Sequence, residues 1–252
     1  MDLGIAGKKA AVAASSAGLG LGAAKALAME GVQVAISGRD GEKLAAAVAE
    51  IEAVSGRTDT VAIEADVSTP DGGVAFAEQA IAQLGQADIL VTNAGGPPPG
   101  TFESTDRDGY QMAIDMNLLA MVEMCRAAIP PMADRGWGRV CAITSVGVKQ
   151  PLGFLMASSV ARAGLTSFLK ITAREMAPKG VTVNSAQPGT HWTDRVAKIM
   201  DQDNAAQSNP MLTTGDSLHF GQAVAYLCSE QARFITGTGL LIDGGQAVGL
   251  LD

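Results

Sequence analysis

Short runs of apolar residues alternate along the chain with longer segments in which apolar residues recur at helical spacing. The runs that predict β-strands cover residues 8–14, 33–37, 58–65, 89–92, 139–144, 182–186 and 239–242, and the segments that predict helices cover residues 19–30, 41–55, 70–84, 107–133 and 154–177. The strand runs are continuously apolar rather than alternating, which is typical of parallel strands buried on both faces. Because most of these strands are followed by a helix, we expect an α/β fold: a Rossmann-like, doubly wound parallel sheet of about seven strands with helices on both faces.

No internal repeat, low-complexity tract or charged linker divides the sequence, so residues 1–252 are expected to form a single domain. One segment is less regular. Residues 196–217 are richer in polar residues and methionine than their surroundings. We expect this segment to form a mobile lid.

The composition narrows the classes of protein to consider. Hydrophobic residues make up 47% of the chain, and 18 basic against 26 acidic residues give a formal net charge of −8. This apolar content excludes a disordered chain, and the negative charge argues against a nucleic-acid partner because phosphates would be repelled. No apolar stretch is long enough to cross a membrane, and Cys125, Cys141 and Cys228 lack the spacing of a metal site or a redox pair. We therefore expect a cytoplasmic protein with no metal and no membrane partner.

A glycine-containing turn connects the first predicted strand to the first predicted helix. It reads Ala14-Ser15-Ser16-Ala17-Gly18-Leu19-Gly20. The two glycines let the chain turn sharply and let a ligand approach the backbone, while free amides at a helix N-terminus favour a diphosphate. The residues expected to bind a dinucleotide here are Ser15, Ser16, Gly18, Leu19 and Gly20.

Further motifs follow this turn in order along the chain. They are Asp66-Val67 after the third predicted strand, Asn93-Ala94-Gly95 after the fourth, Asn117 in the long helix, Ser145 after the fifth strand, and Pro188-Gly189 with Thr193 after the sixth. With this set the sequence resembles the short-chain dehydrogenase/reductase family over essentially its whole length, and in particular its 3-oxoacyl-acyl-carrier-protein reductases. The resemblance implies an oxidoreductase that binds a pyridine nucleotide and acts on a small-molecule carbonyl or alcohol.

The resemblance also assigns expected roles to these motifs. Asp66 and Val67 correspond to the pair that meets the adenine, and Asn93-Ala94-Gly95 to the family's Asn-Ala-Gly turn at the cofactor. Asn117 corresponds to the asparagine that bends its helix and holds a catalytic water, and Pro188-Gly189 with Thr193 to the segment that grips the nicotinamide carboxamide. Because the motifs follow parallel strands, we expect them to converge at the carboxyl edge of the sheet.

The sequence departs from the family in the phosphate-binding turn, where Ala14 replaces the first family glycine. The two glycines nearest the phosphates remain, so we expect the turn to form. At the end of the second strand stands Arg39, with no carboxylate to accept hydrogen bonds from a ribose 2′-hydroxyl. A guanidinium suits a 2′-phosphate, so NADP(H) is preferred as the cofactor and NAD(H) is possible.

The larger departure concerns the catalytic residues. In the family a tyrosine stands thirteen residues after the serine that corresponds to Ser145, and a lysine stands four residues beyond the tyrosine. Those positions hold Ser158 and Arg162. An aliphatic hydroxyl is a far weaker acid than a phenol, and an arginine stays protonated, although it can still hydrogen-bond a ribose. We therefore expect a non-standard proton donor.

Two other residues are candidates for that donor. Lys149 lies in the loop after Ser145, within a Ser-Val-x-Val-Lys-Gln-Pro stretch that resembles a subgroup of the family lacking the tyrosine. His191 follows Pro188-Gly189 and could exchange a proton at neutral pH. Tyr110 and Tyr226 are expected to serve in packing, and His219 to cap a helix or lie at the surface.

Three functions remain open on these residues. The first is an NADP(H)-dependent oxidoreductase, the second a non-redox lyase on the same scaffold, as in dehalogenases that resemble this family, and the third a nucleotide-binding protein without chemistry. The apolar content of the long helices, together with the family's usual assembly, predicts a homotetramer or homodimer.

Overall fold

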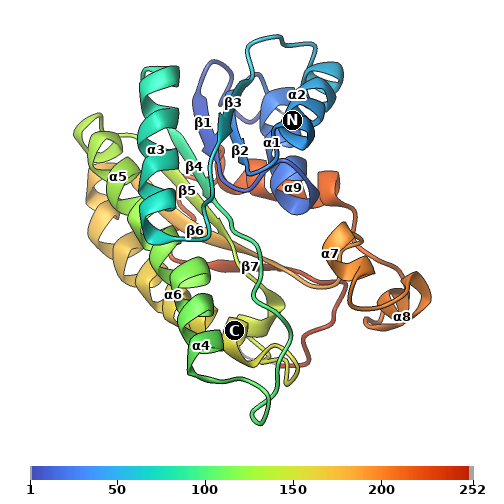
Figure 1. The fold of residues 1–252 in the computed structure, drawn as a ribbon. Coiled ribbons are helices and arrows are strands. Elements are labelled where there is room, and N and C mark those ends of the chain that lie inside the picture. The colour runs from blue at the N-terminus through green and yellow to red at the C-terminus, as the bar shows by residue number, and fades with distance from the viewer. Residues whose placement is uncertain (1, 250–252) are drawn as a thin grey trace.

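The computed structural model describes residues 2–249, and its centre is a seven-stranded parallel sheet in the order β3-β2-β1-β4-β5-β6-β7 (Figure 1). The strands are β1 (Lys9–Val12), β2 (Gln33–Gly38), β3 (Val61–Glu64), β4 (Ile89–Thr92), β5 (Gly138–Ile143), β6 (Val181–Pro188) and β7 (Gly239–Ile242). Every residue of β4 and β5 is buried, which explains their continuous apolar runs. The predicted fold class is confirmed.

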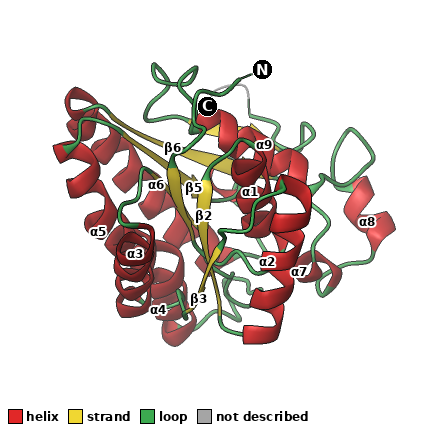
Figure 2. Cartoon of the chain, turned by 90° about the horizontal axis from the view of Figure 1, so that it is seen from above, coloured by secondary structure: helices red, strands yellow, loops and turns green. Residues whose placement is uncertain are grey.

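Helices cover both faces of the sheet (Figures 1 and 2). The first layer contains α1 (Gly18–Met29), α2 (Gly41–Ser55) and α9 (Ser217–Leu227), and the second contains α3 (Pro70–Leu84), α4 (Arg107–Ile114), α5 (Ala120–Asp134) and α6 (Met156–Met176). Each layer packs its own apolar cluster against the sheet, with Leu27, Ile51 and Phe220 buried under the first and Phe76 and Met124 under the second. The sheet therefore separates two cores.

The predicted helix over residues 107–133 differs from the observed one. A π-helical turn, η1 (Asp115–Leu119), separates α4 from α5. Asn117 lies in this turn and is fully buried, and its side-chain amide donates to the carbonyl of Gly95 over 2.9 Å. A π turn accommodates one extra residue in the helix, and such turns occur often at functional sites. The change of pitch accompanies the inward position of Asn117.

The predicted lid segment contains short helices that the sequence pattern did not reveal. Residues 196–217 include the end of α7 (Asp194–Ala197), all of α8 (Gln202–Gln207) and the start of α9. In Figure 1, α7 and α8 lie to the side of the two helical layers. Two single 3₁₀ turns, η2 (Val146–Val148) and η3 (Ala177–Lys179), complete the described elements. None of the helices in the described part of the chain is both long and apolar enough to span a membrane.

Candidate active site

A cavity of about 540 Å³ opens where β1, β4, β5 and β6 end. Many of the residues predicted from the sequence line it, namely Gly18, Leu19, Arg39, Asn93, Ala94, Gly95, Ser145, Ser158, Arg162, Pro188, Gly189, His191 and Thr193. The other predicted residues lie near these but do not line the cavity, namely Ser15, Ser16, Gly20, Asp66, Val67, Asn117 and Lys149. The carboxyl edge of the sheet thus brings the motifs together, as expected for an open parallel sheet.

The turn between β1 and α1 is fixed by side chains from neighbouring strands. Ser37 on β2 accepts a hydrogen bond from the amide of Ala14 over 2.9 Å, and the side-chain amide of Asn93 donates to the carbonyl of Ala14 over 3.1 Å. A Cβ at Gly20 would lie 2.4 Å from that same carbonyl oxygen. Glycine is therefore required at position 20 for the helix to begin so close to the turn.

Within residues 2–249, no side chain caps the first turn of α1. Its N-cap residue, Ala17, carries no side-chain acceptor, whereas Asp40 and Thr69 cap α2 and α3. The hydroxyl of Ser15 does not compensate, because it is fully buried and donates to the carbonyl of Val12 over 2.6 Å. Free amides at the start of a helix favour an anion.

Ala14 adopts a left-handed backbone conformation, with φ of 45°. An L-residue with a Cβ is strained in this region by about 1 kcal/mol, whereas glycine is not. We expect Ala14→Gly to raise the stability of the folded chain by up to about 1 kcal/mol, part of the gain being lost to the greater freedom of glycine in the unfolded chain. Thermal unfolding followed by circular dichroism measures this effect. A variant with a lower Tm than the wild type would contradict the claim that the backbone is strained at Ala14.

Arg39 lies at the end of the cavity beyond β2. Its guanidinium is 3.9 Å from the carboxylate of Asp66, and both side chains are largely exposed, at 73% and 51%. Hydrogen bonding from Ser68 lowers the pKa of Asp66, and the charge of Arg39 lowers it further. An exposed pair at this distance contributes little, so Arg39 is free to bind a phosphate.

A series of hydrogen bonds links Asn117 of η1 to Ser158 and Arg162 of α6. Asn117 donates to the carbonyl of Gly95, and its side-chain oxygen accepts from the hydroxyl of Ser158 over 3.4 Å. The Ser158 oxygen in turn accepts from Nε of Arg162 over 3.2 Å, and Nη1 of Arg162 donates to the carbonyl of Ile143 over 3.0 Å. Ser158 and Arg162 are both buried, so these hydrogen bonds fix the two side chains beside the cavity.

Burial, together with the positive charge of Arg195, lowers the pKa of Arg162 to about 10. The guanidinium remains charged at neutral pH. A hydrogen bond from a charged donor to a hydroxyl oxygen stabilises the deprotonated form of that hydroxyl. The contact of Arg162 with Ser158 acts in this direction, while the burial of Ser158 acts against it.

Ser145 is the N-cap of the 3₁₀ turn η2 and lines the cavity. Its hydroxyl oxygen accepts a hydrogen bond from the amide of Gly147 over 3.0 Å. Because that bond uses a lone pair of the oxygen, the hydroxyl proton is left for a substrate oxygen. Lys149 is the C-cap of the same turn, half-buried and outside the cavity lining.

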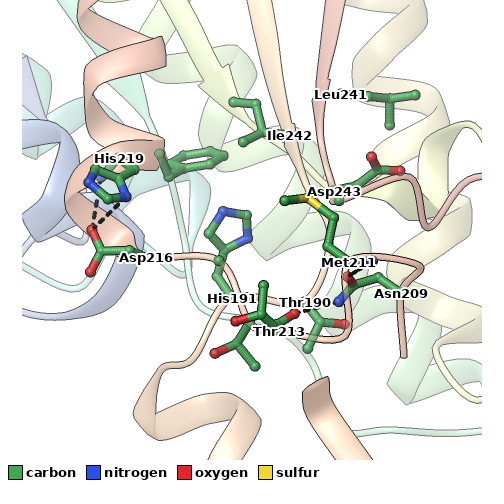
Figure 3. Close-up of a pocket in the computed structure, with 14 residues that line it drawn as sticks. Thr190, His191, Asn209, Met211, Thr213, Asp216, His219, Leu241, Ile242 and Asp243 are labelled. Carbon is green, nitrogen blue, oxygen red and sulfur yellow. Dashed lines mark hydrogen bonds and ion pairs between the residues drawn. The ribbon is translucent and has the colours of Figure 1, made fainter. Parts of the chain in front are cut away.

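His191 lies between the main cavity and a second cavity of about 650 Å³. Figure 3 shows its ring among the residues that line the second cavity, and it meets Phe220 edge to face with ring centres 5.2 Å apart. Burial lowers the pKa of His191 below its ordinary value, so the imidazole is neutral at pH 7. Its Nδ1 lies 3.2 Å from the carbonyl of Gly189, a contact that the Nδ1-protonated tautomer makes as a donor.

Sequence reasoning missed Arg195. Its guanidinium reaches from α7 to the loop after β4, donating to the carbonyls of Gly96 over 2.8 Å and Pro97 over 3.1 Å. The residue lines the main cavity together with Lys198. One signal in the sequence could have indicated Arg195: it stands two residues after Thr193, the last residue of the expected nicotinamide segment.

The chain is similar to known proteins of one family. Residues 13–247 match the family model described as enoyl-(acyl carrier protein) reductase. The chain is 39% identical over 241 residues to nodulation protein G of Azospirillum brasilense, covering 94% of this chain and 97% of that protein. It is 32% identical over 243 residues to the 3-oxoacyl-[acyl-carrier-protein] reductase of Staphylococcus aureus, covering 94% and 97%.

Among solved structures, L-sorbose reductase from Gluconobacter frateurii complexed with NADPH and L-sorbose is similar with a TM-score of 0.91 and 28% identity, over 99% of this chain and all of that one. The resemblance thus extends through the whole fold as well as through the sequence motifs. On the match of the family model and of these relatives, the chain belongs to the short-chain dehydrogenase/reductase family of oxidoreductases.

Proposed function

We propose that the protein is an NADP(H)-dependent reductase that interconverts a small carbonyl compound and the corresponding alcohol. The observation that carries this proposal is the uncapped start of α1, which opens into a cavity whose far wall holds Ser145, Ser158 and Arg162. A diphosphate at the helix start would extend the rest of a dinucleotide along this cavity. The relatives that act on carbonyl compounds, a 3-oxoacyl reductase and a ketose reductase, support the same reaction class.

The residues present fit a dinucleotide. The free amides after Ala17 suit the diphosphate, and Gly20 allows α1 to begin close to the carbonyl of Ala14. Asp66 and Val67 follow the carboxyl end of β3, and we assign the adenine to this part of the site. Pro188-Gly189 and Thr193 lie beside β6, where we assign the nicotinamide carboxamide.

Each protein group then has a role in the reduction. NADPH, when bound, supplies the hydride that reduces the carbonyl carbon. Ser145 donates its hydroxyl proton in a hydrogen bond to the substrate oxygen and so polarises the carbonyl. Ser158 is the proposed proton donor: its hydroxyl proton turns from Oδ1 of Asn117 to the substrate oxygen, and Arg162 stabilises the charge on Ser158 until a proton from water restores the hydroxyl.

This assignment favours Ser158 over the two donors expected from the sequence. Lys149 does not line the cavity. His191 is neutral and directs one ring nitrogen to the Gly189 carbonyl, an arrangement better suited to a base than to an acid. We keep both residues as comparison positions for mutagenesis.

The proposed reaction is tested by following NADPH oxidation at 340 nm with a panel of carbonyl compounds that includes a 3-oxoacyl thioester and a ketose. We expect turnover of at least one class of ketone, with the alcohol formed in proportion to NADPH consumed. Tight binding of NADPH without turnover on the whole panel would contradict the proposal, as would elimination chemistry that leaves the cofactor unchanged.

Arg39 is expected to set the cofactor preference. Because Arg39→Ala removes a charge-assisted contact to the 2′-phosphate, the Kd of NADPH should rise about 10- to 100-fold while that of NADH changes by less than about threefold. Fluorescence titration with both reduced cofactors measures the two constants. Lys43→Ala, which removes an exposed cation from the first turn of α2, is the matched control. Equal loss of both cofactors in the Arg39 variant would contradict the assignment.

We further propose that residues 196–217 act as a lid over the cofactor. Arg195 joins the start of this segment to the loop after β4, across the mouth of the cavity. Hydrogen exchange of residues 196–217 should slow when NADPH is added, because closure protects backbone amides. Residues 41–55 of α2 are the internal reference. Unchanged exchange in 196–217 at saturating NADPH would exclude the lid.

We also propose that the chain assembles as a homotetramer or homodimer through the α4–α6 layer. Large apolar side chains are exposed there, with Met112 at 49%, Val160 at 49% and Ile171 at 64%. Light scattering should report a mass of at least twice the 25.6 kDa of one chain. Ile171→Asp should lower the mass, whereas Val54→Asp, at an exposed position on α2, should not. A monomer in the wild type would contradict the assembly.

A further inference from the structure

The main cavity is lined by more cationic than anionic side chains. Four cationic side chains line it, Arg39, Arg162, Arg195 and Lys198, against one carboxylate, that of Asp194. The chain as a whole carries a formal charge of −8. A cationic cavity in an acidic protein attracts anions into the site.

Arg195 is held in a fixed place in this cavity. Its two bonds to the carbonyls of Gly96 and Pro97 anchor the guanidinium at both terminal nitrogens. A Cβ at Gly96 would lie 2.3 Å from Cζ of Arg195, so the guanidinium packs directly on the glycine backbone. A guanidinium has five N–H donors, and within residues 2–249 only these two have an acceptor. Three donors therefore remain for a ligand.

Arg195 lies close enough to Arg162 for the two charges to repel, and this repulsion contributes to the lowered pKa of Arg162. Arg162 is only 8% exposed, and Nη2 of its guanidinium makes no hydrogen bond to the part of the chain that the structure describes. In residues 2–249 neither arginine forms an ion pair with a carboxylate. Two neighbouring cations without a protein counter-ion favour a bound anion.

The position of Arg162 separates it from the expected anionic groups of the cofactor. The diphosphate is assigned to the start of α1 and the 2′-phosphate to Arg39. Arg162 instead contacts Ser158, beside the point where the carbonyl is reduced. The charge of Arg162 thus lies at the reacting end of the cavity, and Arg195 lines the same cavity.

We propose that Arg195, together with Nη2 of Arg162, binds a carboxylate of the substrate, so that the protein reduces oxo acids in preference to uncharged ketones. This inference rests on the proposed reductase function and specifies its substrate class. The reaction reduces the ketone of the oxo acid to a secondary alcohol with one hydride from NADPH and one proton, and the carboxylate is unchanged.

The test compares acids with their methyl esters, which carry the same ketone without the charge. The NADP⁺-loaded protein is titrated calorimetrically with 3-oxobutanoate, 4-oxopentanoate and the methyl ester of each, and NADPH oxidation is then measured with the same four compounds. We expect at least one acid to bind about 10- to 100-fold more tightly than its ester and to react with a correspondingly higher kcat/KM.

Arg195→Met should remove this difference between acid and ester, while the Kd and kcat/KM of the ester stay within about threefold of the wild-type values. Lys198→Met, which removes a charge from the same cavity, should retain the difference.

Three results would overturn the inference. These are equal binding of acids and esters to the wild type, an equal loss of discrimination in Lys198→Met, or a loss of NADP⁺ affinity in Arg195→Met as large as the loss of acid affinity, which would assign Arg195 to the cofactor. Turnover of uncharged ketones alone would refute the acid preference while the reductase function stands. Selective acid binding without any NADPH oxidation would support the anion site and refute the reductase function.

Discussion

Replacing Ser145 with alanine is expected to lower kcat for carbonyl reduction about 10²- to 10³-fold, the usual loss when one hydrogen-bond donor to a developing oxyanion is removed. The hydroxyl oxygen of Ser145 already accepts from the amide of Gly147, so its proton is the group that remains for the substrate. Removing it takes away an interaction that strengthens in the transition state. The Kd of NADPH should change by less than about threefold, because the diphosphate and the 2′-phosphate are held elsewhere.

Steady-state kinetics and a separate cofactor titration measure these two quantities for Ser145→Ala. Ser159→Ala is the matched control, since Ser159 lies on the same side of the site but outside the cavity lining. A Ser145 variant that reduces its ketone at the wild-type rate would remove Ser145 from the mechanism. Loss of cofactor affinity equal to the loss of rate would instead give it a binding role.

Replacing Ser158 with alanine is expected to lower kcat by about 10²-fold or more, the typical contribution of a positioned general acid. The reason is that Arg162 donates to the Ser158 oxygen and would stabilise the charge left there when the hydroxyl gives up its proton. Ser158→Thr keeps the hydroxyl and should recover most of the rate, whereas Ser158→Ala should not. Rescue by threonine separates proton transfer from packing.

The same kinetics on Lys149→Met and His191→Gln decide between the possible donors. We expect Lys149→Met to stay within about threefold of the wild type, since Lys149 does not line the cavity. A loss of 10²-fold in either of these variants, with Ser158→Ala near the wild-type rate, would transfer the role of proton donor from Ser158 to that residue.

Much of the fold could be predicted because its signals are local. The bounds of α2 and α3 follow from a capping residue at each start, Asp40 and Thr69, and from glycines in the left-handed conformation just beyond each end, Gly56 and Gly85. Such signals act within a few residues of the chain. Continuous apolar runs likewise located the buried parallel strands.

Features set by tertiary contacts could not be predicted. The π turn at Asn117 depends on the carbonyl of Gly95, which is supplied by a distant loop. The short helices α7 and α8 carry too few residues to show a period.

In the candidate site, too, local features could be predicted and features set by tertiary contacts could not. Motif positions could be assigned from the sequence because each follows a strand, and parallel strands end at one edge. The hydrogen bonds among Asn117, Ser158 and Arg162 cross between two helices, and the contact of Arg195 spans 99 positions along the chain. Spacing carries no information about such pairings. For this reason the sequence indicated Lys149 as a donor on its nearness to Ser145, while the structure leaves it outside the cavity lining.

A crystal structure of the chain with NADPH tests the central claim most directly. We expect the diphosphate oxygens to lie about 3 Å from the backbone amides at the start of α1, the 2′-phosphate beside Arg39, and the nicotinamide next to Ser145 and Ser158. A nucleotide bound elsewhere on the molecule, or a cavity that stays free of nucleotide at millimolar NADPH, would contradict the account.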